Sequence, residues 1–550
     1  MLQGRTTLRQ SAVVAATGFV LASLLLASAC RRHRGAPASG GVTADAHEDP
    51  AGAPSRDVTT DHGVVRGVLH EGVFAFRGIP YAAPPVGERR FAPPADAPAW
   101  PSPREANDWG ACCPQLADGK AVGQEDCLTL NVWTPQGARA STGGQGGTRT
   151  GRPVLVFIHG GGNIQGCSAQ EGLGQRTYEG AGLAAARDVV VVTMNYRLGV
   201  LGFLEHAALP RDATNLGLRD QAAALRWVQR NIGAFGGDPK RVLLFGESAG
   251  AEDTCAQLVS PASRGLFSSA LMESAQCPDQ SLAAAEKQGA DVAAKLGCGG
   301  GDVLACLRAK PVDALVTGAP GATLFEKGIK YAPVVDGDVL PKAPLAAIGA
   351  GEHHHVPFAV GSNSEETLLW LRDKPMLGEL GYRLRLDEML GKEKAAEVLA
   401  RYPVASYPDA KEAFIAATTD AVFACPARTL ARAMAKAQQE PVYRYYFSHA
   451  LATRHRAPEH GAVHGLELLF VWGQLHPNGY RPTDGETALS RAIQGYWARL
   501  AAGDPNGEGA RPWPRYHGGD PYLVLDDPVG AGTALHAANC DFWDSVGLGR

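Results

Sequence analysis

The chain lacks a strong net charge, and after its first thirty residues it lacks a second long apolar run. Basic and acidic side chains nearly balance over its 550 residues, and the formal net charge is −4. Nucleic-acid-binding proteins usually carry clustered basic charge, so this balance argues against nucleic acid as a partner. No segment beyond residue 30 is long and apolar enough to span a bilayer. A Cys-x-x-Cys pair, which would suggest a metal site, is also absent.

Residues 1–30 have the organisation of an export signal. Arg5 and Arg9 precede an apolar run over 12–26, and small residues lead to Cys30. The alternative is an uncleaved membrane anchor, because the run is near the lower length limit for a membrane span. Cys30 is similar to the lipidated cysteine of bacterial lipoproteins, so a lipid-tethered and a plain secreted protein both remain open. We expect an exported protein that is secreted, periplasmic or tethered through Cys30 at a bacterial cell envelope.

The rest of the chain divides into a linker and one large domain. Residues 31–56 are rich in Ala, Gly, Pro and charge without periodicity, which predicts a flexible linker. In residues 57–545, apolar strand-like runs alternate with helical segments. This alternation predicts an α/β fold with a mostly parallel central sheet and helices on both faces. The predicted strands are 64–68, 73–77, 125–133, 154–158, 188–193, 241–245 and 357–361; the predicted helices are 215–232 and 251–260; residues 136–152 are predicted to be a mobile loop and 236–239 a turn.

The pentapeptide Gly246-Glu247-Ser248-Ala249-Gly250 stands between an apolar strand and a helix. Strand, Gly-x-Ser-x-Gly turn and helix form the context of a nucleophile elbow, in which a strained turn points the serine hydroxyl at a substrate. The helix start behind Ser248 places positive partial charge where negative charge develops. A passive glycine-rich turn is the alternative for the pentapeptide taken alone.

A second motif, His159-Gly160-Gly161-Gly162, directly follows the buried strand 154–158. Successive glycines leave backbone N–H groups unshielded, and such donors stabilise the oxyanion that forms when an ester carbonyl is attacked. We predict an oxyanion hole made of the N–H groups of Gly161, Gly162 and Ala249. A flexible turn is the alternative for the glycines alone.

Together with further stretches, these motifs resemble the type B carboxylesterase/lipase family, which includes carboxylesterases, cholinesterases and bacterial nitrobenzyl esterases. The matching stretches are 76–81, 125–132, 159–162 and 235–250, and further matches reach Cys540. The resemblance implies an α/β-hydrolase fold with a cap or lid region. It also implies a serine carboxylic-ester hydrolase that forms an acyl-enzyme intermediate.

A serine nucleophile needs a base and an orienting carboxylate, in the chain order serine, acid, histidine. The resemblance selects Glu366, five residues after the glycine that ends strand 357–361, with Glu365 as the alternative. It selects His464 as the base, since the family has His-Gly before an acidic helix start, and it leaves His460 as a loop residue. The resulting Ser248–His464–Glu366 triad requires no metal or cofactor, and Glu247 is expected to have a supporting role.

The eleven cysteines suit an exported enzyme better than a cytosolic one. Cys112 competes with Cys113 for a partner, Cys167 lies outside the family scheme, and Cys255 with Cys277 is a weaker further pair. The resemblance implies three disulfides: Cys113 with Cys127, Cys298 with Cys306, and Cys425 with Cys540.

The substrate is predicted only as a class of small to medium esters. The loop between Cys113 and Cys127 lacks an aromatic residue that could hold a choline cation, which argues against choline esters. Asn163 stands where many relatives have phenylalanine and is expected to make the acyl pocket more polar. A lipase with a cap over 363–405 and a non-catalytic adhesion module remain the alternatives. The oligomeric state is not predicted.

Overall fold

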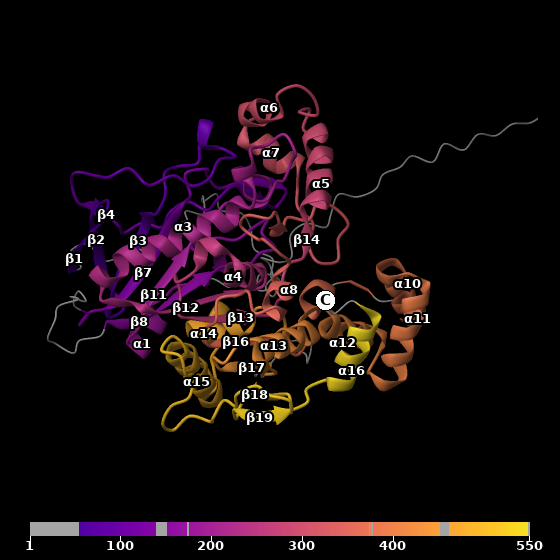
Figure 1. The fold of residues 1–550 in the computed structure, drawn as a ribbon. Coiled ribbons are helices and arrows are strands. Elements are labelled where there is room, and N and C mark those ends of the chain that lie inside the picture. The colour runs from indigo at the N-terminus through magenta and orange to yellow at the C-terminus, as the bar shows by residue number, and fades with distance from the viewer. Residues whose placement is uncertain are drawn as a thin grey trace, which may run out of the picture.

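A single mixed β-sheet runs through the molecule, and helices lie on both of its faces (Figure 1). The computed structural model describes residues 54–138, 151–172, 175–372, 374–375, 378–451 and 461–547. The predicted export signal, Cys30 and nearly all of the predicted linker lie outside these residues. The first strand, β1, begins at Ser55, which is inside the segment predicted as linker. Within the described residues, no helix has the length and apolarity needed to cross a membrane.

The strands follow the order β1-β2-β3-β7-β11-β8-β12-β13-β16-β17-β18-β19, with β4 paired to β2. From β11 to β18 all neighbours are parallel. Antiparallel strands flank this centre on both sides. The predicted mostly parallel sheet is therefore confirmed. The strands are β1 Ser55–Thr60, β2 Gly63–His70, β3 Val73–Pro80, β4 Arg104–Glu105, β7 Thr129–Pro135, β8 Arg152–Ile158, β11 Val190–Met194, β12 Gly237–Glu247, β13 Ser269–Glu273, β16 Phe358–Asn363, β17 Val442–Phe447, β18 Pro521–Leu525 and β19 Gly530–Thr533.

Short strand pairs lie outside the main sheet. They are β5 Gln115–Ala117 with β6 Lys120–Val122, β9 Glu171–Gly172 with β10 Gln175–Arg176, and β14 Gln280–Ser281 with β15 Val334–Val335.

Strand β8 shows how both faces of the sheet are covered. Successive side chains of a strand point to opposite faces. Val156 packs in one apolar cluster with residues of α3 and α4. Phe157 packs in a second cluster with residues of α1, α14 and α15. Because helices shield both faces from solvent, the central strands are apolar at nearly every position. The helices on the two faces are α1 Ala181–Arg187, α3 Leu216–Asn231, α4 Ala249–Val259, α8 Pro344–Gly349, α13 Cys425–Ala437, α14 Glu467–Trp472 and α15 Asp484–Leu500.

A third apolar cluster belongs to a separate group of helices, which we call the cap. Its core includes Leu368, Tyr382, Phe414 and Trp543. In Figure 1 the helices within residues 378–419 and the C-terminal helix gather at one side of the sheet, away from α1 and α3. The cap helices are α9 Leu368–Leu371, α10 Gly378–Leu390, α11 Lys392–Arg401, α12 Ala410–Thr419 and α16 Ala537–Val546. The remaining helices are α2 Gly199–Gly202, α5 Leu282–Lys295, α6 Val303–Ala309 and α7 Val312–Gly318.

Three local predictions were wrong in detail. The turn expected at 236–239 ends early, because Gly236 has a left-handed backbone and β12 already begins at Gly237. The strand predicted over 125–133 is shifted along the chain, since β7 spans Thr129–Pro135, and it is buried at every position. Helix α4 begins at Ala249 rather than Ala251, directly after Ser248. Residues 139–150 of the predicted mobile loop lie outside the described residues, and its last residue opens β8.

Candidate active site

Ser248 occupies a strained turn between β12 and α4. Its backbone has φ 56° and ψ −127°, a conformation that L-residues rarely adopt. Its N–H donates to the carbonyl of Glu273 at 2.9 Å. A Cβ atom at Gly250 would lie 2.0 Å from the carbonyl oxygen of Ile158, and one at Gly246 would lie 2.2 Å from that of Gly250. Both glycines are therefore required sterically for the strand, the turn and the helix to pass so closely.

The glycine loop lies directly against this turn. A Cβ atom at Gly160 would lie 2.9 Å from the Cβ of Ser248. Gly161 and Gly162 have φ values of 110° and 65°. Within the described residues, the N–H groups of Gly161, Gly162 and Ala249 donate to no acceptor. The loop and the first residue of α4 thus carry three unpaired donors near one serine.

Glu366 and His464 are joined by a short hydrogen bond. The distance from His464 Nδ1 to Glu366 Oε2 is 2.6 Å, and Glu366 is fully buried. The other carboxylate oxygen accepts the N–H of Asn363 at 2.7 Å. Glu365 is only half-buried, and its carboxylate lies beside Gly461. Of the two glutamates considered from the sequence, the structure brings Glu366 to the imidazole. His460 lies outside the described residues.

The second imidazole nitrogen faces Glu247. His464 Nε2 is 3.1 Å from Glu247 Oε1. In the described chain no hydrogen bond joins His464 to the Ser248 hydroxyl. Burial disfavours the charged imidazole, but Glu247 and Glu366 outweigh this effect and raise the pKa of His464 to about 9. The imidazole therefore lies between two carboxylates, and its protonation depends on both.

Two further buried glutamates, Glu273 and Glu467, interact electrostatically with Glu247. Glu273 accepts the indole N–H of Trp497 at 2.5 Å, and Glu467 accepts the side-chain amide of Asn363. Burial raises the pKa of Glu467 to about 8 and that of Glu247 to about 7, and it holds the pKa of Glu273 well above its usual range. The sequence analysis did not identify Glu273, since its only signal was an acid at the end of a buried strand.

An aromatic pair covers the imidazole on the cap side, and this pair was also missed. The ring centroids of Trp370 and Phe423 lie 4.9 and 5.1 Å from that of His464. Trp370 follows Glu366 by one helical turn, and Phe423 comes from the wide helical turn Asp420–Ala424. These rings provide an apolar surface next to the base.

The expected polar acyl pocket at Asn163 is not observed. Asn163 is fully buried, and its amide donates to Asp253 at 3.2 Å rather than lining an open site. The buried carboxylate on α4 draws the amide inward, because an unpaired polar group in the core would be costly.

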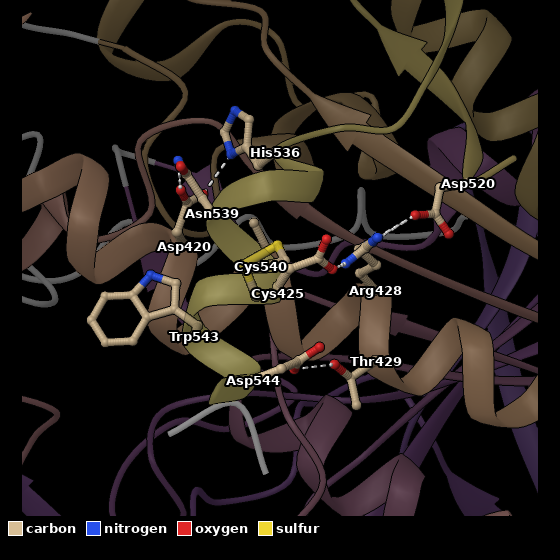
Figure 2. Close-up of a disulfide and its surroundings, with 12 residues drawn as sticks. Asp420, Cys425, Arg428, Thr429, Asp520, His536, Asn539, Cys540, Trp543 and Asp544 are labelled. Atoms are coloured by element: carbon tan, nitrogen blue, oxygen red, sulfur yellow. Dashed lines mark hydrogen bonds and ion pairs between the residues drawn. A yellow bond between two sulfur atoms is a disulfide. The ribbon is translucent and has the colours of Figure 1, made fainter. Parts of the chain in front are cut away.

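The structure pairs ten of the eleven cysteines; the remaining one, Cys30, lies outside the described residues. Figure 2 shows Cys425 joined to Cys540 between α13 and α16, next to the ion pair of Arg428 with Asp520. Cys112 is not a rival for Cys113 but has Cys167 as its own partner. The five disulfides are Cys112–Cys167, Cys113–Cys127, Cys255–Cys277, Cys298–Cys306 and Cys425–Cys540. They include the three that the resemblance implied and the weaker pair Cys255–Cys277.

A family model described as the carboxylesterase family matches residues 54–543. The chain belongs to the carboxylesterase family. It is 35% identical to the para-nitrobenzyl esterase of Bacillus subtilis over 480 residues, covering 84% of this chain and 92% of that protein. It is also 35% identical to the cocaine esterase of Oryctolagus cuniculus over 535 residues, covering 89% and 95%. The resemblance stated from the sequence is confirmed.

The solved structures of this family agree with the sheet described above. A PNB esterase structure matches with a TM-score of 0.75 and 33% identity, covering 89% of this chain and 99% of that one. A thermophilic PNB esterase matches with a TM-score of 0.76 and 32% identity over the same shares. The fold is therefore the predicted α/β-hydrolase fold, and the protein is a carboxylic ester hydrolase that acts on small-molecule esters.

Proposed function

We propose that this carboxylesterase works through the triad Ser248–His464–Glu366. The observation that carries the proposal is the 2.6 Å bond from buried Glu366 to His464, next to a serine in a strained elbow. Glu366 orients the imidazole and stabilises its charged form. His464 takes the proton from Ser248 as the hydroxyl attacks the ester carbonyl.

The oxyanion is held by the N–H groups of Gly161, Gly162 and Ala249. Their lack of other acceptors in the described chain supports this role, because free, fixed donors strengthen as charge develops. His464 then protonates the departing alcohol. Water hydrolyses the acyl-enzyme by the same route and releases the acid and Ser248.

For His464 to act on Ser248, its Nε2 must exchange Glu247 for the hydroxyl. Catalytic hydrogen bonds often form only when substrate is bound. Until that exchange, Glu247 Oε1 lies 3.1 Å from His464 Nε2. Glu247 is thus assigned the supporting role expected from the sequence.

We expect esters with a flat apolar group to be good substrates. Trp370 and Phe423 place aromatic surface beside His464. Relatives named for p-nitrobenzyl esters and for cocaine point in the same direction. A lipase remains the second candidate, since Leu380 and Leu384 on α10 are 66% and 58% exposed and would suit a lipid surface. The non-catalytic adhesion module is disfavoured by the family match.

The test compares wild type with Ser248→Ala on p-nitrophenyl esters from acetate to palmitate and on a p-nitrobenzyl ester. We expect the wild type to hydrolyse short esters and Ser248→Ala to lose about 10,000- to 1,000,000-fold in kcat. A fluorophosphonate probe should label the wild type at Ser248. Activity only on long chains above their solubility limit would favour the lipase, and an unlabelled, inactive wild type would contradict the triad.

We also propose that the protein is exported and tethered through Cys30 or released. Five disulfides in the described residues suit an oxidising compartment. Palmitate labelling of the protein produced in a bacterium, abolished by Cys30→Ser, would distinguish the tethered form from a plain secreted one.

A further inference from the structure

A chain of buried polar side chains starts at the glycine loop and runs through α4 and α3. Each member is fully shielded from solvent. In order, the members are Tyr196, Asn163, Asp253, Gln221, Gln257 and Ser263. Such a chain is unusual in an apolar core, because every buried polar group must find a partner.

The link between the loop and the helix is the pair Asn163 and Asp253. The amide of Asn163 donates to Asp253 Oδ1 at 3.2 Å, and the amide of Gln221 donates to Oδ2 at 2.5 Å. On its other side, Asn163 Oδ1 lies 3.3 Å from the hydroxyl of Tyr196. That hydroxyl also donates to the carbonyl of His159 at 2.7 Å. The pair thus connects α4 to both ends of the glycine loop.

Asp253 is a buried carboxylate held by amides. Burial raises its pKa to about 7, and the amides of Gln221 and Asn163 act in the opposite direction. No ion pair to Asp253 is found in the described part of the chain. A carboxylate without a cation is costly to bury. An apolar pair would fill this space at lower cost, so the arrangement calls for a function.

The position of the pair suggests what that function is. Asn163 directly follows Gly162 and shares its left-handed backbone, with φ 57°. Asp253 lies one helical turn after Ala249. The proposed oxyanion hole therefore takes its donors from two separate segments, and Asn163–Asp253 is a direct side-chain bond between them. Donors of this kind must keep their spacing to within about 0.5 Å to be effective.

We propose that Asn163 and Asp253 are positioning residues that clamp the glycine loop to α4 and hold the oxyanion hole in register. This inference rests on the proposed function of Gly161, Gly162 and Ala249. It deepens that function by assigning what holds the three donors together. It also explains why position 163 carries an amide that does not face substrate.

The test uses Asn163→Gly and Asp253→Ala, which break the clamp from its two sides. Glycine tolerates the left-handed backbone at 163, so the first variant removes only the side chain. The measurements are kcat and KM on a soluble p-nitrophenyl ester, and the inhibition constant of an aryl trifluoromethyl ketone. Ser248 adds to this ketone to give a tetrahedral oxyanion. We expect kcat to fall about 10- to 100-fold, KM to change less than about two-fold and ketone affinity to fall in parallel with kcat.

Two rescues are expected. Asp253→Asn should keep near-wild-type kcat, because the amide of Asn163 can turn over and accept from the new amide. The double swap Asn163→Asp with Asp253→Asn should recover kcat relative to Asp253→Ala. In it, the new amide donates to the carboxylate at 163, and its carbonyl still accepts from Gln221.

Gln257→Met is the matched control. Gln257 is equally buried and donates to Gln221 at 3.0 Å, but three hydrogen bonds separate it from Asn163. We expect it to lower the unfolding midpoint while kcat and ketone affinity stay at wild-type values. If Asn163→Gly and Asp253→Ala behaved in the same way, the clamp would be overturned as purely structural. An unlabelled wild-type Ser248 would instead reject the proposed function, so the two failures are distinguishable.

Discussion

The two halves of the candidate site are built from different materials. The half at the ends of β8 and β12 is mostly backbone: a strained Ser248, unpaired N–H groups and glycines that no larger residue could replace. The cap half is made of side chains, with Trp370 and Phe423 on short helical segments above a separate apolar core. Under the proposed mechanism, the comparison teaches that the reaction chemistry would rest on the sheet, while contact with the apolar part of a substrate would rest on the cap.

The largest expected effect is on kcat, and it should distinguish substitution of Glu366 from substitution of its neighbour Glu365. Glu366→Gln should lower kcat about 10,000-fold, because the imidazole loses its orienting carboxylate. Glu365→Gln is the matched control and should stay within about two-fold, since no bond joins it to His464 in the described chain. Steady-state kinetics on p-nitrophenyl acetate measures both. Equal losses in the two variants would contradict the assignment of Glu366.

The pH dependence tests whether Glu247 controls the base on the sheet side. His464 must be neutral to accept a proton, so kcat/KM should rise with pH as the imidazole deprotonates. Its pKa is raised to about 9 in the free enzyme, largely because Glu247 and Glu366 oppose the effect of burial. Glu247→Gln removes one carboxylate that stabilises the charged imidazole, so the pKa of His464 should fall. The rise of kcat/KM with pH should therefore occur at lower pH than in the wild type.

The control for this profile is Glu205→Gln. Glu205 is another buried glutamate, but it accepts the N–H of Asn215 and does not contribute to the pKa of His464. The pH dependence of kcat/KM in this variant should have the same midpoint as in the wild type. If kcat/KM of Glu247→Gln rose at the same pH as in the wild type, the 3.1 Å contact would have no part in setting the protonation of His464.

Removal of the disulfide Cys425–Cys540 tests how much this covalent link between α13 and the cap helix α16 contributes to stability. Replacing both cysteines with alanine should lower the free energy of unfolding by about 2–4 kcal/mol. Replacing Cys298 and Cys306 should cost less in the chain-entropy account, because their separation is 8 residues rather than 115. Thermal unfolding compares the two, and fluorophosphonate labelling at 25 °C should persist in both. A larger loss for the short loop would contradict this account.

The smallest effect concerns the outer face of the cap. Leu380→Gln with Leu384→Gln should leave hydrolysis of soluble esters within about two-fold, because surface changes away from a site cost little. Hydrolysis of emulsified long-chain esters should drop if α10 meets a lipid surface. Measurement on both substrates separates esterase from lipase. Glu379→Gln, on the same helix, serves as the surface control.

Much of the sheet side could be predicted from local sequence. Buried strands appear in the sequence as apolar runs. The elbow and the glycine loop appear as short motifs at positions where only glycine fits. The cap side could not be predicted in the same way. Trp370 and Phe423 are ordinary aromatic residues in sequence, and only the packing of the turn Asp420–Ala424 against α9 brings them to one imidazole. The same holds for Asn163, whose inward direction depends on a carboxylate ninety residues away.

The sequence by itself determined the family, the α/β architecture, the elbow at Ser248 and the candidate residues Glu366 and His464. The architecture and the elbow follow from periodicity, glycine sterics and motif order, whereas Glu366 and His464 follow from the family resemblance. Only the tertiary structure decided that Glu366 rather than Glu365 reaches His464, that Glu247 occupies Nε2, that Cys112 pairs with Cys167, and that Asn163 binds Asp253. Each of these depends on distances between segments far apart in the chain, which burial and packing set and no local pattern records.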